Sequence, residues 1–531
     1  MTAEDSAAVG AAGSVLLGVF RGERAPAPVL TALADGNLAG VALYRTLNAR
    51  DPVQVAALTA QLRAASADGG RLPPLICTDQ EGGQLVGLPG TTPFPGNLAL
   101  AAAGDPALTE RVGRAIGTEL AAMGLTLDWA PVCDLLSEPG NPAVGGRSFG
   151  DDPRRAAGHA AAFVRGLRSA GVGSSAKHFP GIGATVLDPH LGMASLATDR
   201  EALFARELAP FVAAIDAGVD TVMAAHLRLP GIDPDGRSVL QSPVILGGLL
   251  RSELGFEGVV VTDALDMGAV DQANLDSGAV DAIRSGVDLL LPGPAHADPP
   301  DRIDRLRREI EDAARVDSTF ADRLARSAAR VDELRRRFGG TVRPSIELVG
   351  GAEHRELARE VATRAITQIR DDAGLLPLRP EPGARVLVIV PKPADLTPAD
   401  TSSFLSIQLA RALRDRWPAT IVDELIVPID PGDADMAAAR DRARAADIVV
   451  LGTINAFAID AQRRLAEAVL AAAADSVLVA MRLPHDASAL PAARTALATY
   501  GIEAPTIEVL VDVLSGRAVP RGRVPVSFAS S

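Results

Sequence analysis

The first half of the chain places ionisable side chains at or just after the ends of short apolar runs. Carboxylates, histidines, one lysine and one arginine make up this set. These groups can exchange protons or form charged hydrogen bonds with a polar ligand. Gathered at one place, they would form a site for chemistry on a small molecule. The candidate residues are Asp79, Arg147, Lys177, His178, Asp188, His190, His226 and Asp263.

The apolar runs are nearly continuous in hydrophobicity, which is typical of strands buried on both faces. Helical patterns separate the runs. Two of these patterns begin with an aspartate before a proline, at Asp105 and Asp152, a pair suited to the first turn of a helix. The eight runs occupy residues 14–20, 40–44, 73–79, 125–135, 171–179, 219–227, 258–265 and 286–293.

This alternation predicts an α/β fold that begins with a (β/α)8 TIM-type barrel of roughly 340 residues. A doubly wound open sheet also fits the pattern. In a barrel of this kind the catalytic groups lie at the carboxyl ends of the strands. The candidate residues would then converge on one rim.

A second βα pattern follows the barrel. An arginine-rich helix ends at residues 339–340, and residues 341–345 have the composition of a linker. We therefore expect a catalytic domain over residues 1–340 and an αβα sandwich domain over residues 341–531. The sandwich would serve as a packing or dimerisation partner that shapes outer subsites, in a monomer or a homodimer.

The composition excludes several classes of function. The net charge of −14 at pH 7 argues against a nucleic-acid surface. No apolar run approaches the roughly 20 residues of a membrane span, and the first residues lack the basic segment of a secretory signal. Cys77 and Cys133 lie in apolar runs, which predicts buried reduced thiols. We therefore expect a cytoplasmic protein that acts on a small-molecule or neutral-polymer substrate.

Lys177 is unusual because lysine occurs only at positions 177 and 392 of this chain. Arginine supplies almost all of the other positive charge. A lysine inside a predicted barrel strand therefore suggests a role as a compact charged donor, which arginine cannot fill.

The other candidates also have simpler interpretations. Asp79 and Asp263 could cap helices, His226 could be a core histidine, and Asp188 with His190 could order a loop. A metal site that combines His178 with these last two lacks an HExxH pattern or clustered cysteine and histidine spacing. We expect no metal and no cofactor.

Five segments resemble glycoside hydrolase family 3, and most closely its bacterial β-N-acetylglucosaminidase, or β-hexosaminidase, branch. The resemblance covers about residues 14–340, and KHFPG followed by a D-x-H loop is its most specific part. Residues 365–378 and 512–528 are similar to parts of the sandwich domain that many members carry. The five segments are TDQEGGQ, GNPAVGGRSFG, KHFPGIGATVLDPH, MAAHL and GFEGVVVTDALDMGAV.

The resemblance implies a role for each candidate. Asp263 matches the nucleophile that forms a glycosyl-enzyme intermediate. His190 matches the general acid/base, and Asp188 matches the carboxylate that fixes its tautomer. The residues that match the grip on the sugar in the −1 subsite, or line the same pocket, are Asp79, Arg147, Lys177, His178 and His226.

Three positions depart from the family pattern. Ile182 replaces the usual second histidine after KHFPG, Gln84 replaces the usual arginine after EGG, and residues 44–49 lack the usual arginine-asparagine pair. These changes touch the rim of the pocket, so they put the aglycone preference in doubt more than the chemistry. Pro189 stiffens the loop that carries His190.

The function implied first is hydrolysis of terminal β-linked N-acetylglucosamine, from cell-wall fragments recovered into the cytoplasm or from chitooligosaccharides. An alternative is phosphorolysis of the same bond, because a histidine repels inorganic phosphate less than a glutamate would. A catalytically silent sugar-binding protein is a third possibility, although both Asp263 and His190 are present. A β-glucosidase would need an acid/base carboxylate elsewhere, so this activity ranks lower.

Overall fold

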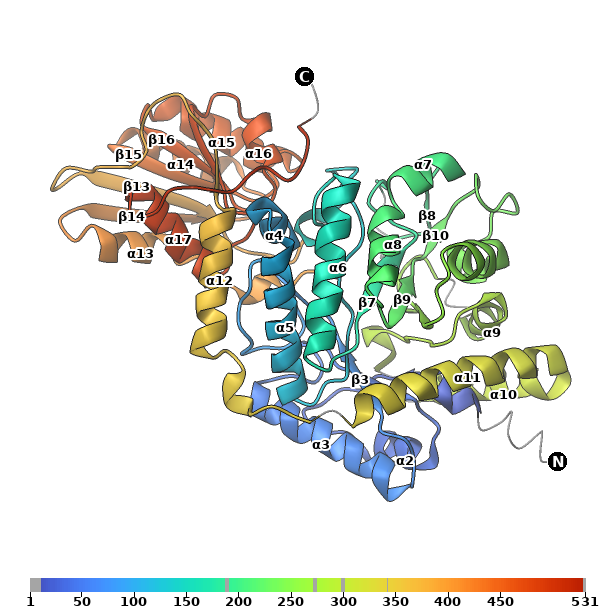
Figure 1. The fold of residues 1–531 in the computed structure, drawn as a ribbon. Coiled ribbons are helices and arrows are strands. Elements are labelled where there is room, and N and C mark those ends of the chain that lie inside the picture. Colours follow the sequence, from blue (N-terminus) through green and yellow to red (C-terminus); the bar gives the residue numbers. More distant parts are fainter. Residues whose placement is uncertain (1–10, 187–190, 271–274, 298–300, 341, 529–531) are drawn as a thin grey trace.

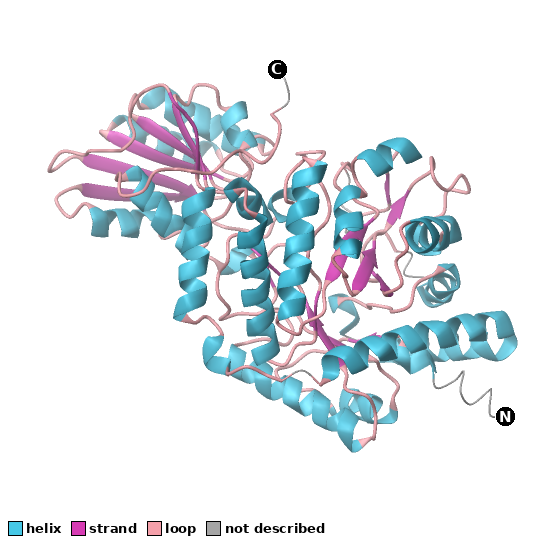
Figure 2. Cartoon of the chain, viewed as in Figure 1, coloured by secondary structure: helices cyan, strands magenta, loops and turns pink. Residues whose placement is uncertain are grey.

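The computed structural model describes residues 11–186, 191–270, 275–297, 301–340 and 342–528. The chain has a mixed α/β fold with parallel sheets (Figure 1). Figure 2 shows that helices surround the strands in both halves of the molecule.

Each of the eight apolar runs contains a strand or a bridged residue. Parallel pairing joins β1-β2-β3-β6 in one set and β7-β9-β11 in another. Single parallel bridges connect Leu127 with Gly173, Val261 with Leu289, and Leu290 with Leu16. The pairings therefore run in chain order and return to the first strand. The strands are β1 (Leu17–Gly18), β2 (Gly40–Ala42), β3 (Leu75–Thr78), β6 (Leu127–Asp128), β7 (Ser175–Phe179), β9 (Thr221–Ala224) and β11 (Val259–Thr262).

Several of these strands contribute side chains to one buried apolar cluster, together with residues of the helix α11 (Ser318–Gly339). Leu17, Cys77, Met223 and Leu289 come from strands or bridges spread around the ring, and all four are nearly inaccessible to solvent. Burial of this kind from several strands at once holds the ring together through the hydrophobic effect.

Helices follow the strands and cover the outside of the ring. The predicted caps are confirmed, because the carboxylate of Asp105 accepts the backbone N–H of Ala107 and that of Asp152 accepts the backbone N–H of Arg154. The helices include α2 (Ala27–Asp35), α3 (Pro52–Asp68), α4 (Asn97–Ala103), α5 (Pro106–Ala122), α6 (Pro153–Ser169), α7 (Arg200–Ala205), α8 (Ala209–Asp216), η3 (Val244–Glu253), α9 (Leu275–Ser285), α10 (Asp301–Val316) and α11 (Ser318–Gly339).

A six-stranded sheet forms the second half, in the order β12-β17-β16-β15-β13-β14, with β12 antiparallel to its neighbour. Side chains of β13 alternate between two apolar clusters. Val388 packs with α13 and α17, whereas Ile389 packs with α14 and α15. Because successive strand residues face opposite sides, the sheet lies between two helix layers. The elements are β12 (Thr367–Asp371), β13 (Arg385–Pro391), β14 (Ile421–Val427), β15 (Ile448–Thr453), β16 (Ser476–Ala480), β17 (Thr495–Ala498), α13 (Leu409–Arg416), α14 (Asp433–Arg444), α15 (Asp460–Ala472), α16 (His485–Ala489) and α17 (Ala504–Leu514).

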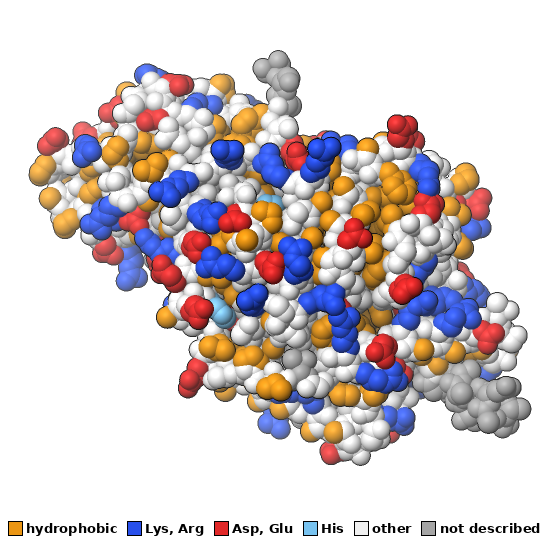
Figure 3. Space-filling view, in the orientation of Figure 1, with side chains coloured by type: hydrophobic (Ala, Val, Ile, Leu, Met, Phe, Trp, Pro, Cys, Tyr) orange, Lys and Arg blue, Asp and Glu red, His pale blue; other side chains and the backbone are white. Residues whose placement is uncertain are grey.

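The helix α12 (Ala352–Ala365) joins the two halves, since it packs against both α4 and α17. Ion pairs also cross this junction, from Arg111 to Glu360 and from Arg364 to Asp105. Figure 3 shows positive and negative side chains interleaved over this face of the molecule. Exposed pairs of this kind contribute little to stability, so apolar packing along α12 dominates the junction.

None of the helices in the described ranges combines the length and the apolar character that a membrane span requires.

Candidate active site

A cavity of about 480 Å³ lies where the carboxyl ends of the N-terminal strands meet a loop of the second half. Strand ends and loops of the N-terminal half supply most of the lining residues. Asp79 comes directly after β3, Lys177 and His178 lie in β7, and Asp263 comes directly after β11. Arg147 ends the short helix η1 (Gly145–Arg147) in the loop after β6. Parallel strands deliver their carboxyl ends to one side, so these side chains meet.

The structure brings together five of the eight residues expected from sequence. Asp79, Arg147, Lys177, His178 and Asp263 all line the cavity. Asp188 and His190 lie outside the described residues.

His226 lines a different cavity of about 370 Å³, next to Arg228 and Met193. Its Nε2 donates a hydrogen bond of 2.9 Å to the carbonyl oxygen of Ala264, the residue after Asp263. His226 therefore contacts the backbone of the β11 loop, and the structure does not place it among the groups of the first cavity.

Lys177 is the centre of a buried charge network. Its Nζ lies 2.6 Å from Asp79 Oδ1 and 2.7 Å from Glu81 Oε1. Arg147 binds Glu81 with two parallel hydrogen bonds, of 2.9 Å from Nε and 2.7 Å from an Nη atom. Only the Asp79 carboxylate is partly exposed, at 24% of its side chain. Asp79 is therefore the most exposed member of the network, and Glu81 holds the two cations at the wall of the cavity.

Electrostatics keep the network ionised. Burial alone would raise the pKa of Glu81, but the charges on Arg147 and Lys177 outweigh it and lower that pKa to about 2. Burial would lower the pKa of Lys177, but Asp79 and Glu81 outweigh it, so the ammonium stays charged. Glu81 is not among the residues expected from sequence, although it lies two positions after Asp79 in β4 (Gln80–Gly82).

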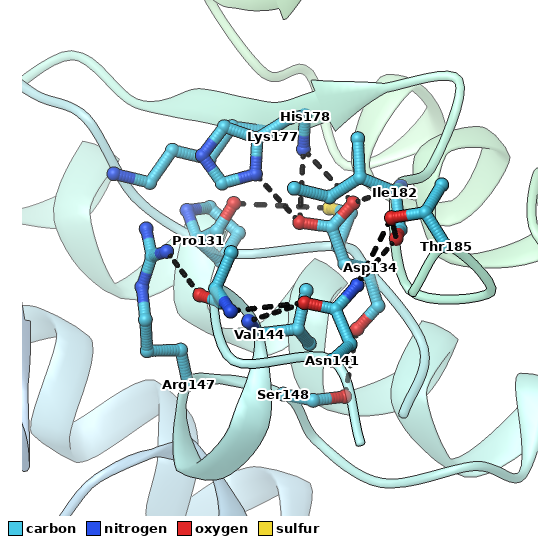
Figure 4. A network of polar contacts seen from close by, with 12 residues as sticks. Pro131, Asp134, Asn141, Val144, Arg147, Ser148, Lys177, His178, Ile182 and Thr185 are labelled. Carbon is cyan, nitrogen blue, oxygen red and sulfur yellow. Dashed lines mark hydrogen bonds and ion pairs between the residues drawn. The ribbon is translucent and has the colours of Figure 1, made fainter. Parts of the chain in front are cut away.

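His178 is fixed by Asp134, which is fully buried behind it (Figure 4). The distance from His178 Nδ1 to Asp134 Oδ2 is 2.6 Å, and the backbone N–H of His178 also points to this carboxylate. Because Asp134 accepts from Nδ1, the ring is held in the tautomer or charge state that protonates this nitrogen. Asp134 lies inside the fourth apolar run, and its position there is the only sign of its role in the sequence.

The departure at Ile182 has a structural explanation. Its side chain is buried, and its backbone N–H donates to Asp134 Oδ1 at 2.9 Å. Its carbonyl oxygen accepts from Asn141 Nδ2 at 2.8 Å, as Figure 4 shows. Ile182 therefore supports the site through its backbone and needs no polar side chain.

Tyr44 lines the cavity together with the carboxylates of Asp79, Asp263 and Asp266. Burial, together with Asp79, Asp266 and Asp263, raises the pKa of the Tyr44 phenol well above its usual value. The backbone N–H of Ala264 donates to Asp263 Oδ1 at 2.8 Å, which orients this carboxylate. Tyr44 and Asp266 are further residues that the sequence did not indicate, although each lies at the end of an apolar run or just after it.

Within the described residues, no group of three or more histidine, cysteine, aspartate or glutamate side chains is arranged to hold a metal ion. Cys77 and Cys133 are buried free thiols, and burial raises the pKa of each well above its usual value. Both thiols are therefore protonated and unreactive at neutral pH.

The model of the glycosyl hydrolase family 3 N-terminal domain matches residues 20–334, which is more than half of the chain. This segment contains the cavity residues from Tyr44 to Asp263. The chain belongs to glycosyl hydrolase family 3, which confirms the resemblance seen in its motifs.

Individual relatives agree with this assignment. The chain is 33% identical over 376 residues to β-hexosaminidase A of Pseudoalteromonas piscicida, across 66% of this chain and 62% of that protein. It is 39% identical over 263 residues to the β-hexosaminidase of Xanthomonas campestris pv. campestris (strain B100), across 48% of this chain and 76% of that protein. A solved family 3 β-N-acetylglucosaminidase from Paenibacillus sp. str. FPU-7 matches with a TM-score of 0.87 and 31% identity, over 99% of both chains.

Proposed function

We propose that this chain is a retaining glycosidase that removes terminal β-linked N-acetylglucosamine from cell-wall fragments or chitooligosaccharides. Family membership and the names of its relatives support this activity. The observation that carries the proposal is the cavity itself. A carboxylate after β11 faces a network of charged hydrogen-bonding groups on β3 and β7. This is the arrangement that a glycosidase needs to bind sugar hydroxyls beside a nucleophile.

The N-terminal half is, in this proposal, a closed (β/α)8 barrel over residues 1–340, followed by a sandwich domain over residues 341–531. The return of the parallel pairing to the residue before β1 supports closure, and the apolar cluster that these strands share supports a packed barrel interior.

The reaction proceeds in two steps. Asp263 attacks the anomeric carbon, a bond from that carbon to the carboxylate oxygen forms, and the bond to the leaving oxygen breaks as His190 gives that oxygen a proton. A water molecule then attacks the same carbon and gives a proton to His190, and the bond between that carbon and Asp263 breaks. The resemblance assigns His190 and its partner Asp188, and both lie outside the described residues.

The charged network binds the sugar during these steps. Asp79 accepts hydrogen bonds from hydroxyl groups, while Lys177 and Arg147 donate to them. These bonds stabilise the transition state most when the donors are held rigidly, and Glu81 provides that rigidity from behind. His178, oriented by Asp134, adds one further polar contact.

The test is turnover of 4-nitrophenyl N-acetyl-β-D-glucosaminide with and without millimolar phosphate, followed by analysis of the sugar product. Free N-acetylglucosamine, released equally in both conditions, is the expected result. Sugar 1-phosphate that forms only with phosphate would replace the hydrolase with a phosphorylase. A folded protein with no turnover in either condition would contradict the proposed activity and favour a silent sugar-binding protein.

A further inference from the structure

The loop from Asp395 to Phe404, which follows β13 in the second half, forms one wall of the cavity. Asp395, Thr397, Asp400, Thr401 and Phe404 from this loop line the cavity opposite the N-terminal strand ends. The substrate site is therefore shared between two parts of the chain that are far apart in sequence.

A buried ion pair holds the loop in place. Asp400 Oδ2 lies 2.9 Å from an Nη atom of Arg482, and both side chains are nearly inaccessible to solvent. Arg482 also donates to Ser402 Oγ at 2.7 Å. Asp400 accepts the backbone N–H groups of Leu396 and Ser402, at 3.1 and 2.9 Å. These contacts fix the loop at both ends.

The loop is also attached to the barrel side of the cavity. The backbone N–H of Thr401 donates to the carbonyl oxygen of Gln84 at 2.7 Å, and Thr401 Oγ1 accepts from the backbone N–H of Val86 at 3.0 Å. Gln84 is one of the three departures from the family pattern, and its backbone carries this attachment.

The rim of the cavity contains a cation and an aromatic ring in contact. The guanidinium carbon of Arg45 lies 4.3 Å from the centroid of the Phe404 ring. Phe404 remains 51% exposed, so a large apolar surface faces solvent at the entrance. Asp395 lies on the same rim, where Ser403 donates to its carboxylate from the backbone N–H at 2.8 Å and from Oγ at 2.7 Å.

We propose that Arg45, Asp395 and Phe404 form the acceptor subsite, and that this subsite takes a neutral second sugar ring on the leaving side of the scissile bond. The proposal rests on the proposed function and adds the chemistry of the leaving group. Phe404 offers an apolar surface to the C–H face of the ring. Arg45 donates hydrogen bonds to its oxygens, and Asp395 accepts from its hydroxyls. The positive and negative charges at the rim cancel, which favours a neutral ring over an anionic one.

The first test compares wild-type protein with Phe404→Ala on two substrates. Methyl N-acetyl-β-D-glucosaminide has no ring on the leaving side, whereas N,N′-diacetylchitobiose has one. We expect the ratio of kcat/KM for the disaccharide to kcat/KM for the methyl glycoside to fall about threefold to tenfold in the variant. Phe404→Tyr keeps the ring and should restore the ratio. An unchanged ratio in a folded Phe404→Ala protein would overturn the proposal.

Ile421→Ala is the matched control, because Ile421 is an exposed apolar side chain of the same half that lies outside the cavity. It should leave both kcat/KM values at wild-type levels. A fall in the ratio for this variant as well would show that the effect is not specific to the rim.

A binding measurement separates the subsite from the chemistry. Calorimetry in an Asp263→Asn background compares the affinities for the disaccharide and for N-acetylglucosamine. Phe404→Ala should weaken disaccharide binding several-fold more than monosaccharide binding, even where turnover fails. A disaccharide whose reducing-end ring carries a carboxylate tests the charge argument. Stronger binding of that ligand than of the neutral one, lost in Arg45→Gln, would overturn the assignment to a neutral ring.

Discussion

Lys177 Nζ and Glu81 Oε1 lie 2.7 Å apart in the wall of the cavity, and both side chains are only 1% exposed. Arg147, equally buried, binds the same glutamate. The Glu81 carboxylate thus pairs with two buried cations. Asp79 pairs with Lys177 as well, and its partly exposed carboxylate lines the cavity.

Glu81→Ala should therefore destabilise the protein strongly, because it leaves Arg147 buried without its carboxylate partner and Lys177 paired with Asp79 alone. We expect a loss of about 3–5 kcal/mol in the free energy of unfolding, measured by urea denaturation. The control is Glu23→Ala, which removes an exposed partner of Arg50. It should cost no more than about 1 kcal/mol. Equal losses in the two variants would contradict the role given to Glu81.

Glu503 should make the stability depend on pH. Burial raises its pKa to about 7, against about 4.3 in an unfolded chain. The folded protein then holds a proton that the unfolded chain releases, so stability falls as pH rises between these two values. Glu503→Gln should exceed wild type by about 1 kcal/mol at pH 5, where the unfolded carboxyl is already ionised, and by roughly 3–4 kcal/mol at pH 8. Unfolding free energies at both values provide the check, and parallel pH profiles would contradict it.

Asp263→Ala and His190→Ala should each reduce turnover by orders of magnitude without unfolding the protein. Asp263 is the proposed nucleophile, and its removal prevents the covalent intermediate. Loss of His190 should cost roughly 10²–10⁴-fold, and less with a leaving group that needs no proton. Comparing 4-nitrophenyl and methyl glycosides distinguishes the two roles. Near-normal activity in both variants would reject the assigned site.

Asp134→Asn should separate orientation of His178 from overall folding. The amide keeps the shape of the carboxylate but loses the charge-assisted bond to Nδ1, which is 2.6 Å long. A charged hydrogen bond contributes about 1.5–3 kcal/mol, so we expect kcat/KM to fall roughly tenfold to a hundredfold. A purely structural role for Asp134 would lower the free energy of unfolding and leave kcat/KM of the folded variant at the wild-type value.

Much of the fold could be predicted because strands buried on both faces leave continuous apolar runs, and all eight runs contain paired residues. The helix caps at Asp105 and Asp152 could also be predicted from the sequence, because a cap is a contact between residues close together in the chain. His226 follows β9 and lines a cavity other than the one that contains Asp263. In a strand buried on both faces, hydrophobicity does not reveal which of two neighbouring cavities a residue at the strand end lines.

The remaining site residues depend on contacts between distant segments. Glu81 and Asp134 are ordinary carboxylates in sequence, and their roles emerge only when Arg147 and His178 are placed against them. The loop from Asp395 to Phe404 lies more than 100 residues beyond the last N-terminal strand. No local sequence pattern predicts that this loop lines the cavity.

The strand order β14-β13-β15-β16-β17 determines which loop of the second half can contribute to a binding site. In open sheets of this order, the loop after the first strand commonly serves the ligand of the sheet itself. Here that loop, Asp395–Phe404, lines a cavity whose charged groups come from the N-terminal strands. The groups proposed to bind the donor sugar and the loop that carries Asp395 and Phe404 of the proposed acceptor subsite are therefore encoded in separate stretches of the gene, whereas Arg45 is encoded with the first group. Substitutions in the loop can then change the proposed acceptor subsite while the N-terminal groups are kept.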